Sequence, residues 1–117
     1  MCSDLLVALE LCGKNAVSEF RKKMGPSQPS IAKIENPQTL RAIYGKNHSK
    51  NAVHGSNSKE SATRELQFFF HYNSLLKSPA MFKYSSLCLI KPHILKEKKI
   101  GEILNCILAQ GFEISSL

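Results

Sequence analysis

The stretch NAVHGSNS, residues 51–58, decides the fold. Its alanine and valine predict a short strand that ends near His54, and Gly55-Ser56 then forms a tight turn. Asn57 or Ser58 is a suitable cap for the helix that follows, because a short polar side chain accepts from the free amides of a first turn. One face of this helix carries Ala62, Leu66 and Phe69. The stretch therefore places a histidine where a strand passes into a helix.

The residues before this stretch predict a strand, a helix and a loop. The apolar run LLVALEL, residues 5–11, is most simply a buried strand. Asn15 is expected to cap a helix that ends at a Gly-Pro pair. Residues 25–37 are rich in proline and have little periodicity, so an irregular loop is expected. Asn36-Pro37 then predicts the start of another short helix, which Gly45 would end.

The residues after this stretch predict a second unit behind a linker. Residues 71–84 lack a period and contain a proline, so they are expected to be that linker. Residues 86–90, SLCLI, predict a buried strand. The next helix has an apolar stripe made of Ile100, Ile103, Leu104, Ile107 and Leu108. A second strand is expected after Gly111, where apolar residues alternate.

The composition is that of a small globular domain. The chain has 117 residues, 43% of them apolar, and no apolar run approaches the roughly 18 residues that cross a bilayer. The start, MCSDLLVALEL, lacks the basic region of a signal peptide, so a cytoplasmic location is expected. The four cysteines lack zinc-ligand spacing, so free thiols and no metal site are expected. The net charge of +7 favours binding to a polyanion, a nucleotide or an acidic protein surface. It is also that of an ordinary basic surface exposed to water.

Several motifs around the deciding stretch resemble those of the nucleoside diphosphate kinase family. Residues 51–58, followed by Glu65, resemble the signature N-x-x-H-G-S-D-S with a glutamate eleven residues after the histidine. Residues 25–29, GPSQP, are similar to the family's G-x-T-x-P loop, and residues 39–41, TLR, are similar to its T-I-R element. Arg21 falls where the family keeps an arginine. A lone H-G-S would be weak, but these elements share the family's order and spacing.

A second, shorter resemblance begins after the predicted linker. Residues 89–93, LIKPH, are similar to the family's I-K-P-D, and a helix and Gly111-Phe112 follow as they do in the family. The resemblance implies that residues 1–70 are the C-terminal part of a first nucleoside diphosphate kinase-like domain, residues 71–84 a linker, and residues 85–117 the N-terminal part of a second. Two such copies are typical of tandem-domain members of the family.

The resemblance implies an α/β (α+β) fold, in which helices pack on one face of a ferredoxin-like antiparallel sheet that is incomplete in each copy. It also implies an enzyme that transfers the γ-phosphoryl group of a nucleoside triphosphate to a nucleoside diphosphate through a phosphohistidine. By resemblance, His54 is the nucleophile, Glu65 orients its ring, and Ser56 bonds that carboxylate. ATP would be the phosphoryl donor, and Mg²⁺ would enter bound to the nucleotide.

Nucleotide phosphates need positive charge and hydrogen-bond donors around them. The resemblance assigns this role to Arg21, Ser27, Arg41, Asn51 and Lys91. Arg21 is open to a second interpretation, as one more solvated charge in an Arg-Lys-Lys run. Asn57 replaces the usual aspartate, a change expected to lie outside the phosphate contacts, and His93 replaces the aspartate of the second copy. The family's helical hairpin, which stacks on the base, has no counterpart, so weak catalysis is expected.

The two segments are also expected to depend on each other. A unit of two strands is only marginally stable in water, so each segment needs a partner for its apolar face. Residues 86–117 are therefore expected to pack against residues 5–70 and to bring Lys91 near His54. Two arrangements stay open: the segments pair within a single chain, or they pair between two chains in a swapped dimer, which would be a homo-oligomer.

The alternative function comes from a different class of protein. Tandem members of the family are associated with centrosomes and ciliary axonemes, where the chain would be a non-catalytic structural or regulatory domain of a microtubule-associated protein. Its spread positive charge would suit the acidic surface of tubulin or of another cytoskeletal protein. A location at the centrosome or in the cilium or axoneme would then replace a general cytoplasmic one. The two functions are distinguished by whether His54 acquires phosphate from ATP.

Overall fold

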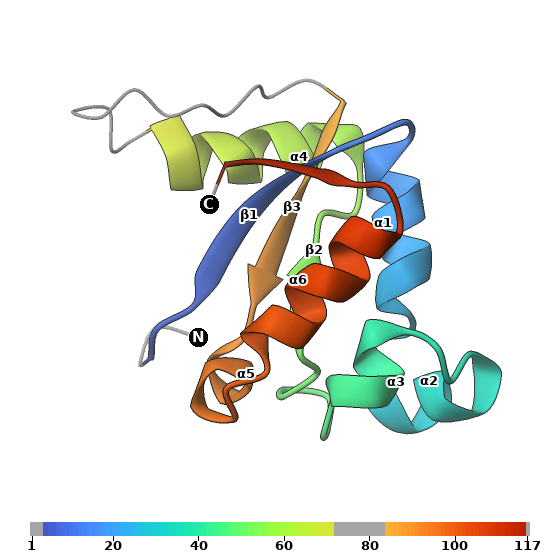
Figure 1. Ribbon diagram of the computed structural model, residues 1–117. Helices are drawn as coiled ribbons and strands as arrows, with labels where there is room; N and C mark the ends of the chain where they lie inside the picture. The colour runs from blue at the N-terminus through green and yellow to red at the C-terminus, as the bar shows by residue number, and fades with distance from the viewer. Residues whose placement is uncertain (1–3, 72–83, 117) are drawn as a thin grey trace.

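The computed structural model describes residues 4–71 and 84–116 (Figure 1). Its elements in chain order are β1 (Val7–Cys12), α1 (Ala16–Met24), α2 (Pro29–Glu35), α3 (Leu40–Tyr44), β2 (Val53–Gly55), α4 (Lys59–Leu66), the π-helical turn η1 (Gln67–His71), β3 (Ser85–Ile90), α5 (Pro92–Lys96), α6 (Ile100–Ala109) and β4 (Glu113–Ser116). The predicted linker, residues 71–84, lies outside the described residues except at its two ends. Within the described ranges, every helix is too short or too polar to cross a bilayer.

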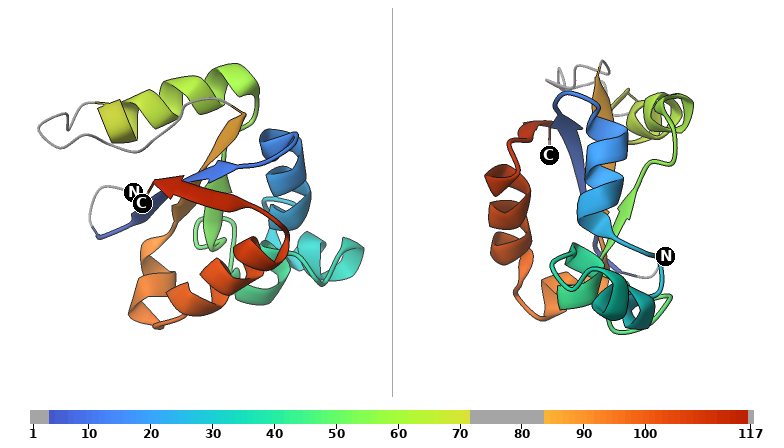
Figure 2. Two further views of the ribbon diagram at one scale, coloured as in Figure 1. Left: turned by 45° about the horizontal axis from the view of Figure 1, so that its top comes forward. Right: turned by 90° about the vertical axis from the view of Figure 1, so that its right-hand side faces the viewer.

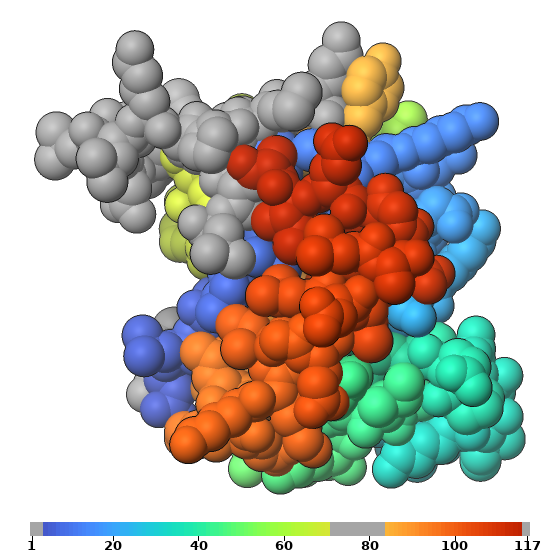
Figure 3. All heavy atoms as spheres, in the orientation of Figure 1, coloured from blue at the N-terminus to red at the C-terminus, as the bar shows by residue number. Residues whose placement is uncertain are grey.

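The four strands form one antiparallel sheet in the order β2-β3-β1-β4. Strand β3 is central: Ile90 lies opposite Val7 of β1 on one side and opposite Val53 of β2 on the other. Every pair joins a strand before residue 72 to a strand after residue 83. Figure 3 shows the later segment, orange to red, packed against the earlier one. The prediction that the two segments complete one sheet is confirmed, here within a single chain.

The order of the strands is that of a ferredoxin-like sheet. If the chain is followed from β3, it consists of two strand–helix–strand units, β3-α6-β4 and then β1-α1-β2. In that numbering the sheet order is fourth, first, third, second, as in the ferredoxin-like fold. In this chain the β1-α1-β2 unit comes first, so the connectivity is circularly permuted. The predicted α/β fold, an antiparallel sheet with helices packed on it, is confirmed.

Helices cover both faces of the sheet (Figure 2). On one face, Phe20 of α1 and Ile107 of α6 share an apolar cluster with Leu11 of β1. On the other face, Leu66 of α4 packs with Leu89 of β3. The expectation of helices on one face only is therefore wrong. Strand β3 is buried at all of its positions, so side chains on both of its faces need cover.

The predicted irregular loop at residues 25–37 contains a helix instead. Pro29 lies in the first turn of α2, where its fixed φ angle and missing N–H group fit a helix start. Asn36 ends α2 and does not start a helix, and α3 begins later, at Leu40. Gly45 ends α3 as predicted. A proline in this region therefore starts a helix where the sequence pattern suggests a loop.

Two other helix starts differ from the expectation. Helix α5, which also begins with a proline, has no counterpart among the predicted elements. Asn15 precedes α1, but its backbone is left-handed, with φ at 52°, and its side chain caps nothing. Its carbonyl oxygen instead accepts from the Glu19 N–H at 2.9 Å. Ser58 caps α4 as predicted, in a reciprocal capping box with Ser61.

Candidate active site

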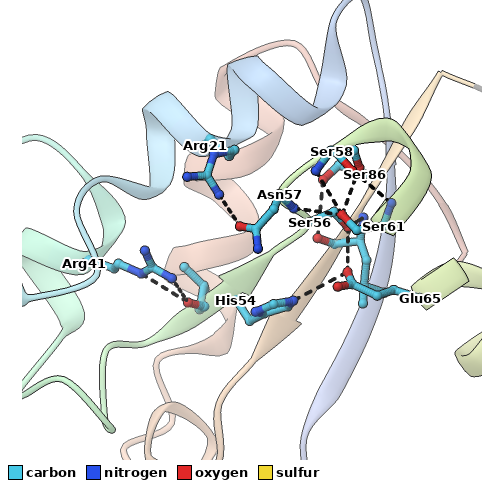
Figure 4. Close-up of polar contacts among 11 residues, drawn as sticks. Arg21, Arg41, His54, Ser56, Asn57, Ser58, Ser61, Glu65 and Ser86 are labelled. Atoms are coloured by element: carbon cyan, nitrogen blue, oxygen red, sulfur yellow. Dashed lines mark hydrogen bonds and ion pairs between the residues drawn. The ribbon is translucent and has the colours of Figure 1, made fainter. Parts of the chain in front are cut away.

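His54 lies at the edge of the sheet, on β2, opposite Leu89 of β3. Its side chain is 34% exposed, and its Nε2 atom lies 3.5 Å from Oε2 of Glu65 (Figure 4). Because Nε2 faces a carboxylate, it is the nitrogen that carries the proton when the ring is neutral. Nδ1 then keeps its lone pair, and it is the atom through which the ring can act as a nucleophile.

The carboxylate of Glu65 is held from two directions. Ser56, which is fully buried, donates its hydroxyl hydrogen to Glu65 Oε2 at 2.7 Å and accepts from the Leu87 N–H at 3.3 Å. The capping box of Ser58 and Ser61 fixes the first turn of the helix that carries Glu65. The carboxylate therefore reaches the imidazole from a helix anchored at its start and through a hydroxyl anchored on β3.

Arg41 is a buried cation held by backbone carbonyls. Only 8% of the residue is exposed. Its Nε and Nη2 atoms donate to the Val53 carbonyl at 3.3 and 3.1 Å, and Nη1 donates to the Gly25 carbonyl at 3.0 Å. Val53 directly precedes His54, so these bonds fix the guanidinium beside the histidine. Burial first, and then the charge of Arg21, lower the pKa of the Arg41 guanidinium below its usual range.

This buried charge lacks an acidic partner. No carboxylate among residues 4–71 and 84–116 forms an ion pair with Arg41. Burial of a charge is costly unless an opposite charge or good hydrogen bonds compensate it, and the hydrogen-bond acceptors described around Arg41 are all neutral. The arrangement favours binding of an anion, whose charge would offset that cost.

Arg21 reaches the same region from α1. Its Nη1 atom donates to Oδ1 of Asn57, in the turn that follows β2. In Figure 4, Arg21 and Arg41 lie to one side of the His54 ring and Glu65 lies to the other. Asn57 therefore bonds one of the residues that are predicted to contact phosphate. Its own place outside those contacts stays a prediction.

Asn51 and Ser27 lie beside Arg41. The Ser27 hydroxyl accepts from Arg41 Nη1 at 3.5 Å, and the Ser27 carbonyl accepts from Asn51 Nδ2 at 2.9 Å. Asn51 is 4% exposed, and its Oδ1 atom has no hydrogen-bond partner in the described structure. A buried acceptor without a partner carries a free-energy cost that a ligand hydroxyl would remove.

Lys91 joins the site from the second segment. It follows β3 directly, and its backbone N–H donates to the Ala52 carbonyl at 2.9 Å, two positions before His54. Its Nζ atom donates to the Ser49 carbonyl at 3.0 Å. Burial first, and then the charge of Arg41, lower the pKa of Lys91 below its usual range. The structure therefore brings the predicted residues of both segments together around β2.

The contacts that sequence reasoning missed are mostly to backbone carbonyls, which have no sequence signature. Val53, Gly25 and Ser49 hold the cations of the site in this way. Ser61 is the exception, because a Ser-x-x-Ser spacing at a helix start indicates a reciprocal cap. His93 is buried at the start of α5, its Nε2 atom has no hydrogen-bond partner within the described ranges, and burial lowers its pKa.

The chain is similar to known proteins of one family. A family model described as nucleoside diphosphate kinase matches residues 1–75. The chain is 36% identical over 117 residues to Nucleoside diphosphate kinase homolog 7 of Rattus norvegicus, and the aligned region covers 98% of this chain and 30% of the relative. It is 40% identical over 119 residues to Thioredoxin domain-containing protein 6 of Xenopus laevis, with 97% and 19% covered. It is 47% identical over 70 residues to Probable nucleoside diphosphate kinase 5 of Arabidopsis thaliana, with 60% and 49% covered.

The chain spans less than half the length of each of these relatives. The match to the family model nevertheless extends over more than half of this chain and contains both His54 and Glu65. The chain belongs to the nucleoside diphosphate kinase family.

Proposed function

We propose that this chain transfers the γ-phosphoryl group of a nucleoside triphosphate to a nucleoside diphosphate, with His54 as the covalent carrier. One juxtaposition supports the proposal: His54 turns Nε2 toward Glu65, and the buried Arg41 is bonded to the carbonyl of the residue just before His54. The histidine supplies a nucleophile with a fixed tautomer, and the arginine supplies a place for phosphate charge.

In the first half-reaction, the lone pair of His54 Nδ1 attacks the γ-phosphorus of the bound triphosphate. The bond from that phosphorus to the bridging oxygen breaks, and the nucleoside diphosphate leaves with the electron pair. The ring becomes cationic as the N–P bond forms, and the negative charge of Glu65, whose Oε2 atom lies 3.5 Å from Nε2, offsets this charge. Arg41, Arg21 and Lys91 offset the negative charge of the leaving diphosphate.

In the second half-reaction, a terminal oxygen of another nucleoside diphosphate attacks the phosphorus held on Nδ1. The N–P bond breaks, the electron pair returns to Nδ1, and the ring is again neutral with its proton on Nε2. One site serves both half-reactions. The two nucleoside diphosphates differ only in base and sugar, whereas the residues named here would contact their phosphates. The reaction is therefore of the ping-pong type.

The expected metal is Mg²⁺, as part of the substrate. The described residues contain no group of three or more side chains able to hold a metal ion. The site itself offers one imidazole and one carboxylate, and that carboxylate is already bonded by Ser56. Magnesium would therefore enter bound to the phosphates of ATP, where it offsets part of their charge.

Labelling with ATP tests the proposal. The chain is incubated with magnesium and ATP labelled in the γ-phosphate, and then with unlabelled GDP. We expect a protein-bound label that is lost in acid and stable in alkali, and that moves to GTP when GDP is added. ATP labelled in the α-phosphate is the control and should leave no label on the protein. Failure of the γ-label to bind, in a chain that is folded by circular dichroism, would contradict the proposal.

Arg41→Ala should weaken the binding of ADP about tenfold or more, because a charge-assisted bond to phosphate contributes roughly 1.5–3 kcal/mol. Lys50→Ala is the matched control, because Lys50 is an exposed cation that bonds Asn47 and Lys46 through its backbone. Titration calorimetry measures both. Equal weakening by the two variants would mean that general positive charge, and not the position of Arg41, attracts the nucleotide.

The net charge of +7 favours one other function, a non-catalytic domain bound to an acidic cytoskeletal surface such as tubulin. A centrosomal or ciliary location would follow from that function. Co-sedimentation with microtubules at increasing salt would test it, because contacts between exposed charges weaken with ionic strength. A chain that takes no label from ATP but sediments with microtubules would have this function instead.

A further inference from the structure

A neutral amide holds one of the two arginines of the site. Arg21 Nη1 donates to Asn57 Oδ1 across 36 positions of the chain, which ties α1 to the turn after β2 (Figure 4). Both residues line a hollow of about 610 Å³ that also includes Gly25 and Thr39. The pair is therefore accessible to a ligand that enters from this side.

Asn57 is itself held in place by the start of α4. Its backbone N–H donates to the Ser61 hydroxyl at 3.0 Å, and Ser61 belongs to the capping box with Ser58. A side chain on such a turn can restrict its partner to one position. An arginine that is already restricted loses less conformational entropy when it binds a ligand.

The charge of Arg21 is left uncompensated by this contact. In the described part of the chain, no carboxylate forms an ion pair with Arg21. This charge acts on Arg41: burial first, and then the charge of Arg21, lower the pKa of Arg41. An aspartate at position 57, the residue usual in the family, would place a negative charge within hydrogen-bond distance of Arg21 and would oppose any phosphate there.

We propose that Asn57 is a positioning residue that raises the affinity of the site for polyphosphate, because it holds Arg21 without neutralising it. This inference rests on the proposed function, since it assumes that the arginines face the phosphates of a nucleotide. It also assigns a consequence to the departure from aspartate at position 57. The chain binds polyphosphate more tightly, and with more dependence on salt, than it would with aspartate there.

The test measures binding of inorganic tripolyphosphate and of ADP to the full chain by calorimetry at pH 7.5, for the wild type and for Asn57→Asp. We expect Asn57→Asp to weaken the binding of both about fivefold at low salt, which is the size of effect expected from one exposed charge pair. The ratio of the dissociation constant of Asn57→Asp to that of the wild type should shrink at high salt, where exposed charges are screened. Arg21→Met is then introduced into both the wild type and Asn57→Asp. In this background the aspartate should have little effect on binding.

Stability separates this effect from damage to the fold. Position 57 lies just before the N-terminus of α4, where a negative charge is favourable, so Asn57→Asp should melt at the same or a slightly higher temperature. Equal affinity of the wild type and Asn57→Asp would overturn the inference and leave the proposed function intact. An effect of the aspartate that persists without Arg21 would also overturn it. No binding of ADP by the wild type would overturn both proposals.

Discussion

His54→Ala should remove all of the acid-labile label that γ-labelled ATP gives to this chain, the largest effect of any single substitution. The imidazole is the group that would form the N–P bond, and among residues 4–71 and 84–116 His54 is the one side chain that pairs with Glu65 through a basic nitrogen. Loss of the covalent intermediate closes the ping-pong route, so the transfer rate to GDP should fall to background. Acid and alkali treatment of the labelled protein, followed by scintillation counting, measures the label.

His48→Ala is the matched control for that experiment. His48 is an exposed histidine in the loop before β2, so its removal should leave the label unchanged. Glu65→Gln should give an intermediate result, because the amide keeps the shape of the side chain but no longer offsets the charge of the phosphorylated ring. Full labelling of His54→Ala would show that another residue carries the phosphate, and the assignment of the site would be wrong.

Ile90→Ala should lower the free energy of unfolding by about 2–5 kcal/mol, the usual cost of removing a large buried aliphatic side chain. Ile90 is fully buried and lies opposite Val7 on one neighbouring strand and Val53 on the other. A cavity at this position weakens the contact between the two segments on both sides of β3. Urea denaturation measures the change, followed by circular dichroism.

The control is Ile34→Ala, because Ile34 is 84% exposed and its truncation should change stability by no more than about 0.5 kcal/mol. We also expect one cooperative transition in both variants, because every strand pair joins the two segments. Two separate transitions, or a loss of stability confined to residues 84–116, would show that the segments fold independently of each other.

The parts of the fold with strong local signals were predictable from the sequence. The strand at His54, the turn after it and the cap at Ser58 depend on residues within a few positions of one another. Helices α2 and α5 were not predicted, because both are short, begin with a proline and have no apolar period long enough to outweigh it. Cover on both faces of the sheet also depends on residues far apart in the chain.

The candidate site was predictable in its residue types but not in its contacts. The motif residues named the histidine, the glutamate and the arginines. The carbonyls of Val53 and Gly25, which hold Arg41, belong to residues whose side chains say nothing about that contact. The bond between Arg21 and Asn57 spans α1 and the turn after β2, so no spacing within one element predicts it.

The interleaved strand order has a consequence for synthesis on the ribosome. Strand β1 emerges before both of its neighbours in the sheet, which belong to the part of the chain after residue 83. Roughly 80 further residues must be added before β3 is available, which takes about 4–16 s at common elongation rates. During that interval the two strands that pair with β1 in the described sheet are both missing, and its apolar side chains are exposed to other nascent chains. A topology with such distant pairing folds slowly and is at greater risk of aggregation.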